Sequence, residues 1–191
     1  MAKLYVIMGK SSTGKDTVYK RIVEKTDVTT ITMYTTRPMR AGEAQGREYF
    51  FIDEETLADL EKEDKIIELR AYNTVHGIWK YLTVDDGQIN PESEEKYLII
   101  ATLEAYEKYL VYYGIEVVVP IYIEVDDRTR IHRALQREDA EQNPKYKEMC
   151  RRFIADEKDF SEEKLKMAGI DMRYDNYDLD ICDDTIIRNM L

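Results

Sequence analysis

Residues 4–17 read LYVIMGKSSTGKDT, and this stretch decides which fold the chain can form. Its first five residues are continuously apolar, which is typical of a strand buried on both faces of a parallel sheet. The segment 15–25 then carries Val18, Ile22 and Val23 at helical spacing. Between the two lies a match to G-x-x-x-x-G-K, a pattern whose backbone N–H groups bind phosphate at a helix N-terminus. The stretch therefore predicts a strand, a phosphate-binding loop and a helix.

The loop pattern predicts binding of a nucleoside triphosphate but does not specify a reaction. Lys15 is expected to reach the β- and γ-phosphates of ATP and to neutralise charge that moves during phosphoryl transfer. The alternative is a glycine-containing turn with a surface lysine, which the flanking strand and helix make unfavourable. The residues expected to bind ATP are Gly9, Ser11, Ser12, Thr13, Gly14, Lys15, Asp16 and Thr17.

The residue after the loop lysine departs from the usual pattern. A Ser or Thr that holds Mg²⁺ is common there, whereas this chain has Asp16 followed by Thr17. A carboxylate is a good ligand for a hard cation, so Asp16 and Thr17 are candidate ligands for the Mg²⁺ that accompanies ATP. Alternatively, Asp16 only stabilises the helix N-terminus, where acidic residues are favoured.

Further strands and helices are expected to alternate along the chain. The expected strands cover residues 29–36, 66–72, 97–101, 117–125 and 179–182, and the expected helices cover 53–63, 103–110, 128–137 and 145–166. Residues 80–96 match no clear element. This alternation predicts a parallel α/β sheet covered by helices on both faces.

Composition limits the classes of function. A length of 191 residues suits one domain, and the net charge of −11 argues against nucleic-acid binding while allowing a small anionic ligand in a local basic cleft. No apolar run is long enough to span a membrane, and the short apolar start is no secretory signal, so a cytoplasmic protein is expected. Cys150, Cys182, His76 and His132 lack zinc-site spacing, and reduced thiols are expected.

A second cluster, residues 35–51, reads TTRPMRAGEAQGREYFF. Two arginines three residues apart and a tyrosine suit a phosphate clamp, because each arginine presents a planar fork of donors to phosphate oxygens. The segment resembles the T-T-R-x-x-R-x-G-E-x-x-G-x-x-Y-x-F pattern of guanylate kinases. The resemblance implies that Arg37, Arg40 and Tyr49, together with Glu43, bind the acceptor nucleotide. A solvated basic loop is the alternative.

The resemblance continues into the region that reads the base, with departures. Glu68 lies in a segment similar to the family's F-[IL]-E, which implies that Glu68 accepts hydrogen bonds from guanine; a simply exposed glutamate is the alternative. His76 stands where a phosphate-binding tyrosine is usual, and Ile78 stands where a hydroxyl is usual. Thr102 replaces an Asp-x-Asp motif and could offer only its hydroxyl. Guanine specificity is therefore left open.

A third cluster is expected to form a lid. The stretch 133–137 resembles the R-L-x-x-R that enters the lid of guanylate kinases, and Arg152 follows near the family's next lid arginine. Arginines on a mobile segment can stabilise the charge of the transition state. Lys15, Arg133, Arg137 and Arg152 are the expected catalytic residues. Arg130 is expected to form ion pairs on an exposed helix surface.

The resemblance implies a single domain with the three-layer α/β fold of P-loop NTPases. The expected core covers residues 1–33, 79–137 and 149–191, with a nucleoside-monophosphate-binding insert at 34–78 and a lid at 138–148. The implied reaction is Mg²⁺-dependent transfer from ATP to GMP or dGMP, by a monomer or homodimer. Alternatives are the same fold with another acceptor, such as another monophosphate or ribose 1,5-bisphosphate, and a non-catalytic guanylate-kinase-like binding module.

Overall fold

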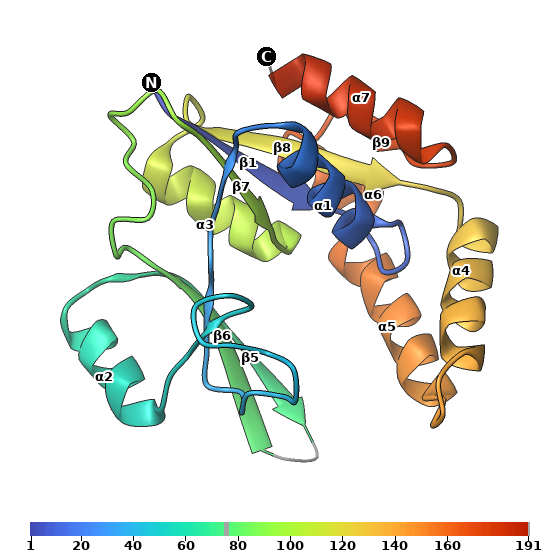
Figure 1. The fold of residues 1–191 in the computed structure, drawn as a ribbon, viewed down its shortest axis with the longest axis horizontal. Helices are drawn as coiled ribbons and strands as arrows, with labels where there is room; N and C mark the ends of the chain where they lie inside the picture. The colour runs from blue at the N-terminus through green and yellow to red at the C-terminus, as the bar shows by residue number, and fades with distance from the viewer. Residues whose placement is uncertain (75–76, 191) are drawn as a thin grey trace.

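The core of the protein is a parallel sheet that carries the phosphate loop. The structure, a computed structural model, describes residues 1–74 and 77–190, and in this part of the chain five parallel strands form the sheet in the order β2-β7-β1-β8-β9 (Figure 1). The strands are β1 (Lys3–Met8), β2 (Thr29–Thr30), β7 (Lys96–Ile100), β8 (Val118–Glu124) and β9 (Arg173–Asp175). The parallel sheet predicted from the apolar runs is confirmed.

Helices cover both faces of this sheet. Helices α1 (Lys15–Lys25) and α7 (Leu179–Met190) pack on one face, and α3 (Leu103–Tyr113) and α6 (Glu162–Met167) pack on the other. Strand β1 serves both cores, because side chains alternate across a strand. Its even-numbered residues Leu4, Val6 and Met8 join the α3 core, while Tyr5 and Ile7 join the α1 core. The result is the three-layer α/β fold of P-loop NTPases.

A second, smaller sheet lies beyond the core and is built within residues 34–84. Four strands of the described chain form it in the order β4-β3-β6-β5, with β3 (Tyr34–Thr35), β4 (Phe50–Phe51), β5 (Ile66–Thr74) and β6 (Gly77–Val84). Helix α2 (Glu54–Lys62) packs on it through Leu57, which is buried with Leu82 and Val84. The carboxylate of Asp53 accepts the N–H of Thr56 at 2.8 Å and so caps this helix.

Two helices project from the core beside the phosphate loop. Helix α4 (Asp127–Asp139) follows β8, and α5 (Tyr146–Asp159) returns beside it (Figure 1). Asp126 caps α4 by accepting the N–H of Thr129 at 3.0 Å. Residues 140–145, between the two helices, are without helix or strand and fall in the segment expected to be a lid.

Three predicted elements are wrong in type or extent. The expected strand 29–36 is split between the two sheets, because the chain leaves the core sheet after Ile31 donates its N–H to the carbonyl of Leu98. The expected helix 145–166 breaks at Phe160, which is buried in the core, and Ser161 caps the next helix. The expected strand 179–182 is the first turn of α7.

These errors arise because short stretches of sequence do not distinguish a helix from a strand. Four residues from Leu179 cannot distinguish strand from helix, whereas over twelve residues the buried Cys182, Ile186 and Met190 repeat at helical spacing. Strand β6 was not expected, because residues 80–96 show no clear period of their own. Its pairing with β5 and β3 defines it.

Helix α7 offers a direct test of this packing. Ile186 is fully buried, and Ile181 on the same helix is 65% exposed. The change Ile186→Ala is expected to lower the free energy of unfolding by about 2–5 kcal/mol, because it removes transfer energy and leaves a cavity. Ile181→Ala is expected to change it by less than about 0.5 kcal/mol. Urea unfolding of both variants measures the difference, and equal losses would contradict the assigned core face.

Candidate active site

The phosphate loop leaves the carboxyl end of β1, and the two glycines of its sequence pattern are sterically required. Gly9 has φ +145°, and a Cβ there would lie 2.3 Å from the carbonyl oxygen of Ile123 on β8. Gly14 has φ +94°, and a Cβ would lie 2.3 Å from the side-chain nitrogen of Asn176. Backbone and side chains thus approach the loop too closely for any other residue.

The loop carbonyls are held by side chains. The carbonyl of Lys10 accepts from Lys15 Nζ at 3.0 Å and from the Thr13 hydroxyl at 3.0 Å. The carbonyl of Thr13 accepts from Asn176 Nδ2 at 2.8 Å and from Arg133 Nη1 at 3.3 Å. These bonds restrict rotation of the peptide planes of the loop. A loop of this sequence pattern uses its backbone N–H groups to bind phosphate.

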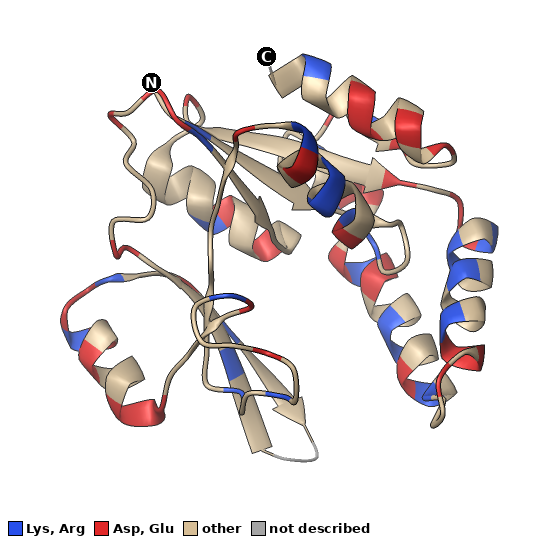
Figure 2. Cartoon of the chain, in the orientation of Figure 1, with Lys and Arg blue, Asp and Glu red and all other residues tan. Residues whose placement is uncertain are grey.

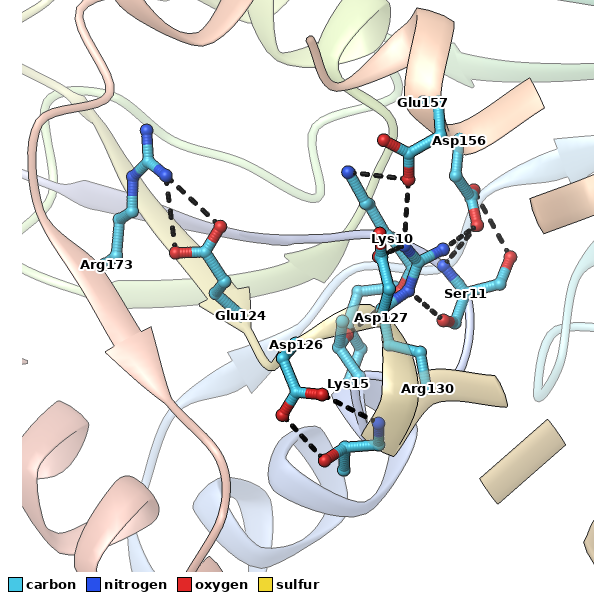
Figure 3. A network of polar contacts seen from close by, with 12 residues as sticks. Lys10, Ser11, Lys15, Glu124, Asp126, Asp127, Arg130, Asp156, Glu157 and Arg173 are labelled. Atoms are coloured by element: carbon cyan, nitrogen blue, oxygen red, sulfur yellow. Dashed lines mark hydrogen bonds and ion pairs between the residues drawn. The ribbon is translucent and has the colours of Figure 1, made fainter. Parts of the chain in front are cut away.

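A buried arginine ties the same loop to helices α4 and α5 (Figure 3). Arg130 is 1% exposed; its Nε donates to the carbonyl of Ser11 at 3.0 Å, and its Nη2 donates to Asp156 at 2.7 Å. The Asp156 carboxylate also accepts the backbone N–H of Ser11 at 2.8 Å. Glu157, next on α5, pairs with Lys10 at 2.7 Å and with Arg130 at 3.1 Å. The expected ion pairs of Arg130 are therefore present, but the expected exposure is wrong.

Burial dominates the environment of Lys15. Desolvation lowers the pKa of its ammonium group, and the nearby charges of Arg130 and Arg137 act in the same direction, while Asp16 and Asp156 oppose them. A phosphate bound in the loop would stabilise the charged form of Lys15.

Asp16 and Thr17 are exposed in the first turn of α1. No cluster of three or more candidate metal ligands occurs in residues 1–74 and 77–190. The exposed oxygen atoms of Asp16 and Thr17 fit Mg²⁺ bound with ATP, because that ion is usually held by one or two carboxylates together with substrate phosphates. The exposed oxygen donors of Asp16 and Thr17 remain the candidate ligands.

The expected lid arginines divide into two groups. Arg137 and Arg152 line a cavity of about 310 Å³ between α4 and α5, whose wall includes Ser11 and Ser12 of the loop. Arg133 binds the loop carbonyl described above and the carbonyl of Asn176 at 2.7 Å, which suits a positioning role. Figure 2 shows further Lys and Arg positions along α4 and α5, so basic charge is concentrated here in an acidic chain.

The expected acceptor clamp lies in residues 37–49 of the insert. Arg37 is 3% exposed, and Glu43 binds both ends of its guanidinium at 3.0 and 2.9 Å. Glu43 also accepts the backbone N–H of Arg40 at 2.7 Å, and the guanidinium of Arg37 lowers the pKa of this carboxyl. Glu43 therefore orients the two arginines. The Arg40 side chain is exposed, and Tyr49 lies under Arg37 with its ring centroid 5.5 Å away.

A cleft of about 600 Å³ lies between helix α1, which follows the phosphate loop, and the segment that contains Tyr49. Asp16 and Lys20 of α1 line one side, and Met33 and Tyr49 line the other. The carboxyl ends of the core strands form its floor through Ile99 and Ile100 of β7. Ligands of open α/β sheets bind in crevices at this end of the strands.

The base-reading candidates are arranged differently from the expectation. Glu68 is buried, and both its oxygens bind Arg70: Nε at 2.8 Å and Nη2 at 3.1 Å. Thr83 adds a hydrogen bond at 2.9 Å, and Thr102 accepts from Arg70 Nη1 at 3.4 Å. Ile78 is 56% exposed. The remaining candidate, His76, lies outside the described residues.

Sequence reasoning missed four residues of this region. They are Arg70, Tyr81, Asp156 and Asn176. Tyr81 lies on the unpredicted strand β6, with its ring 5.6 Å from Tyr49 and its hydroxyl beside Arg37. A signal existed for Arg70, because an arginine two residues from a glutamate on a strand shares its face. Nothing local pointed to Asp156, since its partners lie 26 and 145 residues away.

Comparison with known proteins gives matches to guanylate kinases. The family model for guanylate kinase matches residues 1–80. The resemblance to the guanylate kinase family is confirmed. A guanylate kinase from Thermus thermophilus is 39% identical over 70 residues, which are 37% of this chain and 32% of that protein. A guanylate kinase from Legionella pneumophila is 37% identical over 76 residues, which are 39% of this chain and 36% of that protein.

The sequence matches thus cover about a third of the length of these guanylate kinases. The fold similarity reaches further: a crystal structure of guanylate kinase from Anaplasma phagocytophilum aligns with 99% of this chain and 84% of that chain, with a TM-score of 0.65 and 19% identity. At this identity the match establishes the fold alone.

No helix in the described residues combines the length and apolar character that crossing a membrane requires.

The Arg130 network carries a prediction about the loop. Arg130→Ala leaves the carboxylates of Asp156 and Asp127 without their buried partner and is expected to lower the free energy of unfolding by about 3–5 kcal/mol. Arg128→Ala, an exposed neighbour on α4, is expected to change it by less than about 0.5 kcal/mol. Chemical denaturation with calorimetric titration of ATP measures both effects. If the two variants matched wild type in stability and ATP affinity, the network would not support the loop.

Proposed function

We propose that the protein is an ATP-dependent nucleoside-monophosphate kinase with guanylate-kinase-like architecture. The single observation that carries the proposal is a cleft lined both by the helix that follows the phosphate loop and by the end of the clamp segment. Asp16 and Lys20 of α1 line it on one side, and Tyr49 lines it on the other. A donor phosphate and an acceptor phosphate held there would face each other at the carboxyl edge of the sheet.

The proposed mechanism needs positioning and charge neutralisation only. The second pKa of a phosphate monoester is ~6, so the acceptor is a dianion near neutral pH and attacks without a protein base. Lys15 and the loop N–H groups hold the transferring phosphoryl group, while Arg40 and Tyr49 hold the acceptor in line. Asp16 or Thr17 would hold the Mg²⁺ that accompanies ATP, and this ion would neutralise part of the phosphate charge.

The two helices beside the loop complete the proposal. Arg137 and Arg152 reach the cavity next to Ser11 and Ser12 from opposite helices. Closure of residues 138–148 would bring these guanidinium groups to the phosphates and exclude water. Arg133 contributes by fixing the loop carbonyl of Thr13.

GMP and dGMP are the acceptors that the family resemblance favours, giving GDP and dGDP. Acceptors other than guanine nucleotides are favoured by a specific observation: Glu68 is already bound by Arg70, and Ile78 offers no hydroxyl to a base. A non-catalytic binding module is opposed by the intact loop, whose carbonyls at Lys10, Ser11 and Thr13 are fixed for anion binding.

The proposal is tested by measuring ADP formation from ATP and Mg²⁺ with a panel of acceptors. The panel contains GMP, dGMP, AMP, CMP, UMP, dTMP, IMP and ribose 1,5-bisphosphate. Turnover with any of the monophosphate nucleotides supports the proposed kinase. Turnover only with ribose 1,5-bisphosphate, or ATP binding without any turnover, would overturn it.

Lys15 is the residue on which turnover should depend most. Lys15→Ala removes the cation that faces the transferring phosphates, so kcat is expected to fall by at least about 100-fold, the scale of losing one charge-stabilising donor. Lys108→Ala, an exposed lysine on α3 that lines neither the cleft nor the cavity beside the loop, serves as the matched control. Steady-state kinetics with the best acceptor measure both. Comparable activity in the two variants would refute the assignment of the loop.

A further inference from the structure

A buried ion pair between Arg70 and Glu68 lies behind Met33, which lines the acceptor cleft. Arg70 binds Glu68 through Nε and Nη2, with one contact to each carboxylate oxygen, at 2.8 and 3.1 Å. The side chains are 10% and 1% exposed, respectively. The hydroxyl of Thr83 donates a hydrogen bond to Glu68, and the hydroxyl oxygens of Tyr109 and Thr83 lie 2.7 Å apart. Glu68 is thus fully engaged by its own neighbours.

This arrangement conflicts with direct reading of guanine by Glu68. Guanine would present N1–H and N2–H₂, two parallel donors that require both carboxylate oxygens. The guanidinium of Arg70 presents the same two-donor fork and already occupies those oxygens. A base could replace it only by separating a buried ion pair, which is strongly unfavourable.

The outer end of Arg70 is bound much more weakly. Its Nη1 donates to the Thr102 hydroxyl at 3.4 Å, and its Nη2 lies 3.6 Å from the sulfur of Met33. Met33 lines the 600 Å³ cleft beside Tyr49. A thioether and a long hydroxyl contact are poor partners for a guanidinium, so stronger acceptors from a ligand would replace them readily.

We propose that Arg70, held in place by Glu68, is the group that selects the acceptor in this protein. The ligand feature that it recognises is a pair of adjacent lone-pair acceptors instead of a pair of N–H donors. Three sources carry this chemistry: N7 and O6 of a 6-oxopurine, N3 and O2 of cytosine, and the oxygens of a second phosphate. Glu68 is then a positioning residue. This inference rests on the proposed kinase function.

The test compares kcat/KM for GMP and IMP in the wild-type protein. IMP keeps N7 and O6 but lacks the N2 amine that a carboxylate reader requires. If Arg70 reads the acceptor, IMP is used within about fivefold of GMP, or CMP or ribose 1,5-bisphosphate is used better than either purine. A preference for GMP over IMP above about 50-fold, with GMP the best acceptor, would overturn the inference while leaving the kinase proposal intact.

Two variants distinguish recognition of the acceptor by Arg70 from a purely structural role of the Arg70–Glu68 ion pair. Arg70→Met removes the fork and frees Glu68; it is expected to lower kcat/KM for the best acceptor by about 10- to 100-fold, chiefly through KM, and to increase the ratio of GMP to IMP use. Glu68→Gln can still accept one hydrogen bond from Arg70 and is expected to keep the wild-type order of acceptors. A Glu68→Gln protein that folds but loses only its guanine acceptors would contradict the inference. ATP affinity, measured by calorimetry, should match wild type in both variants.

No turnover of any acceptor by the wild-type protein would instead be a failure of the proposed function. If Arg70→Met fails to fold, the ratio of GMP to IMP use by the wild-type protein and the acceptor order of Glu68→Gln still show whether Arg70 or Glu68 recognises the acceptor.

Discussion

The fixing of the phosphate-loop carbonyls by side-chain donors is the constraint on which the rest of the site depends. Lys15, Arg130, Arg133 and Asn176 each donate to a carbonyl in residues 10–13, and they come from α1, from α4 and from the turn after β9. Without these bonds, the peptide planes of the loop would be free to rotate. The core sheet brings these elements to one edge, and the two glycines allow their close approach.

This constraint also explains how an acidic protein can hold anions. The net charge of −11 is spread over the surface, whereas the arginines near the loop lie on α4 and α5 (Figure 2). Asp156 and Glu157 hold that basic cluster in place and, in this structure, bind the loop residues Ser11 and Lys10 directly. On the acceptor side Glu43 and Glu68 do the same for Arg37 and Arg70. The carboxylates therefore position the cations and lower their number of free conformations.

Much of this could be predicted from the sequence, for physical reasons that differ between elements. Strand β1 and helix α1 were predicted to the residue or nearly so, because a long apolar run, a glycine pattern and a helical period agree. Strand β6 and helix α7 were not predicted. Strand β6 is defined by its pairing with β5 and β3, and α7 shows its helical period only over its full length. Candidate site residues with a local pattern, such as Arg37, could be named from the sequence, and their roles stay predictions. Those defined by distant contacts, Arg130 above all, were judged on local charge alone and expected to be exposed.

The most direct test of the account is whether one ligand can span both phosphate sites. Calorimetric titration would compare ATP with adenosine 5′-pentaphosphate, whose terminal phosphates extend from the loop toward Arg40 and Tyr49. The account predicts that the pentaphosphate binds at least about 10-fold more tightly than ATP, and that Arg40→Ala removes this gain, because a linked second site adds its binding energy without a second association cost. Equal affinities of the wild-type protein for the two ligands would contradict the claim that the cleft holds a donor and an acceptor phosphate together.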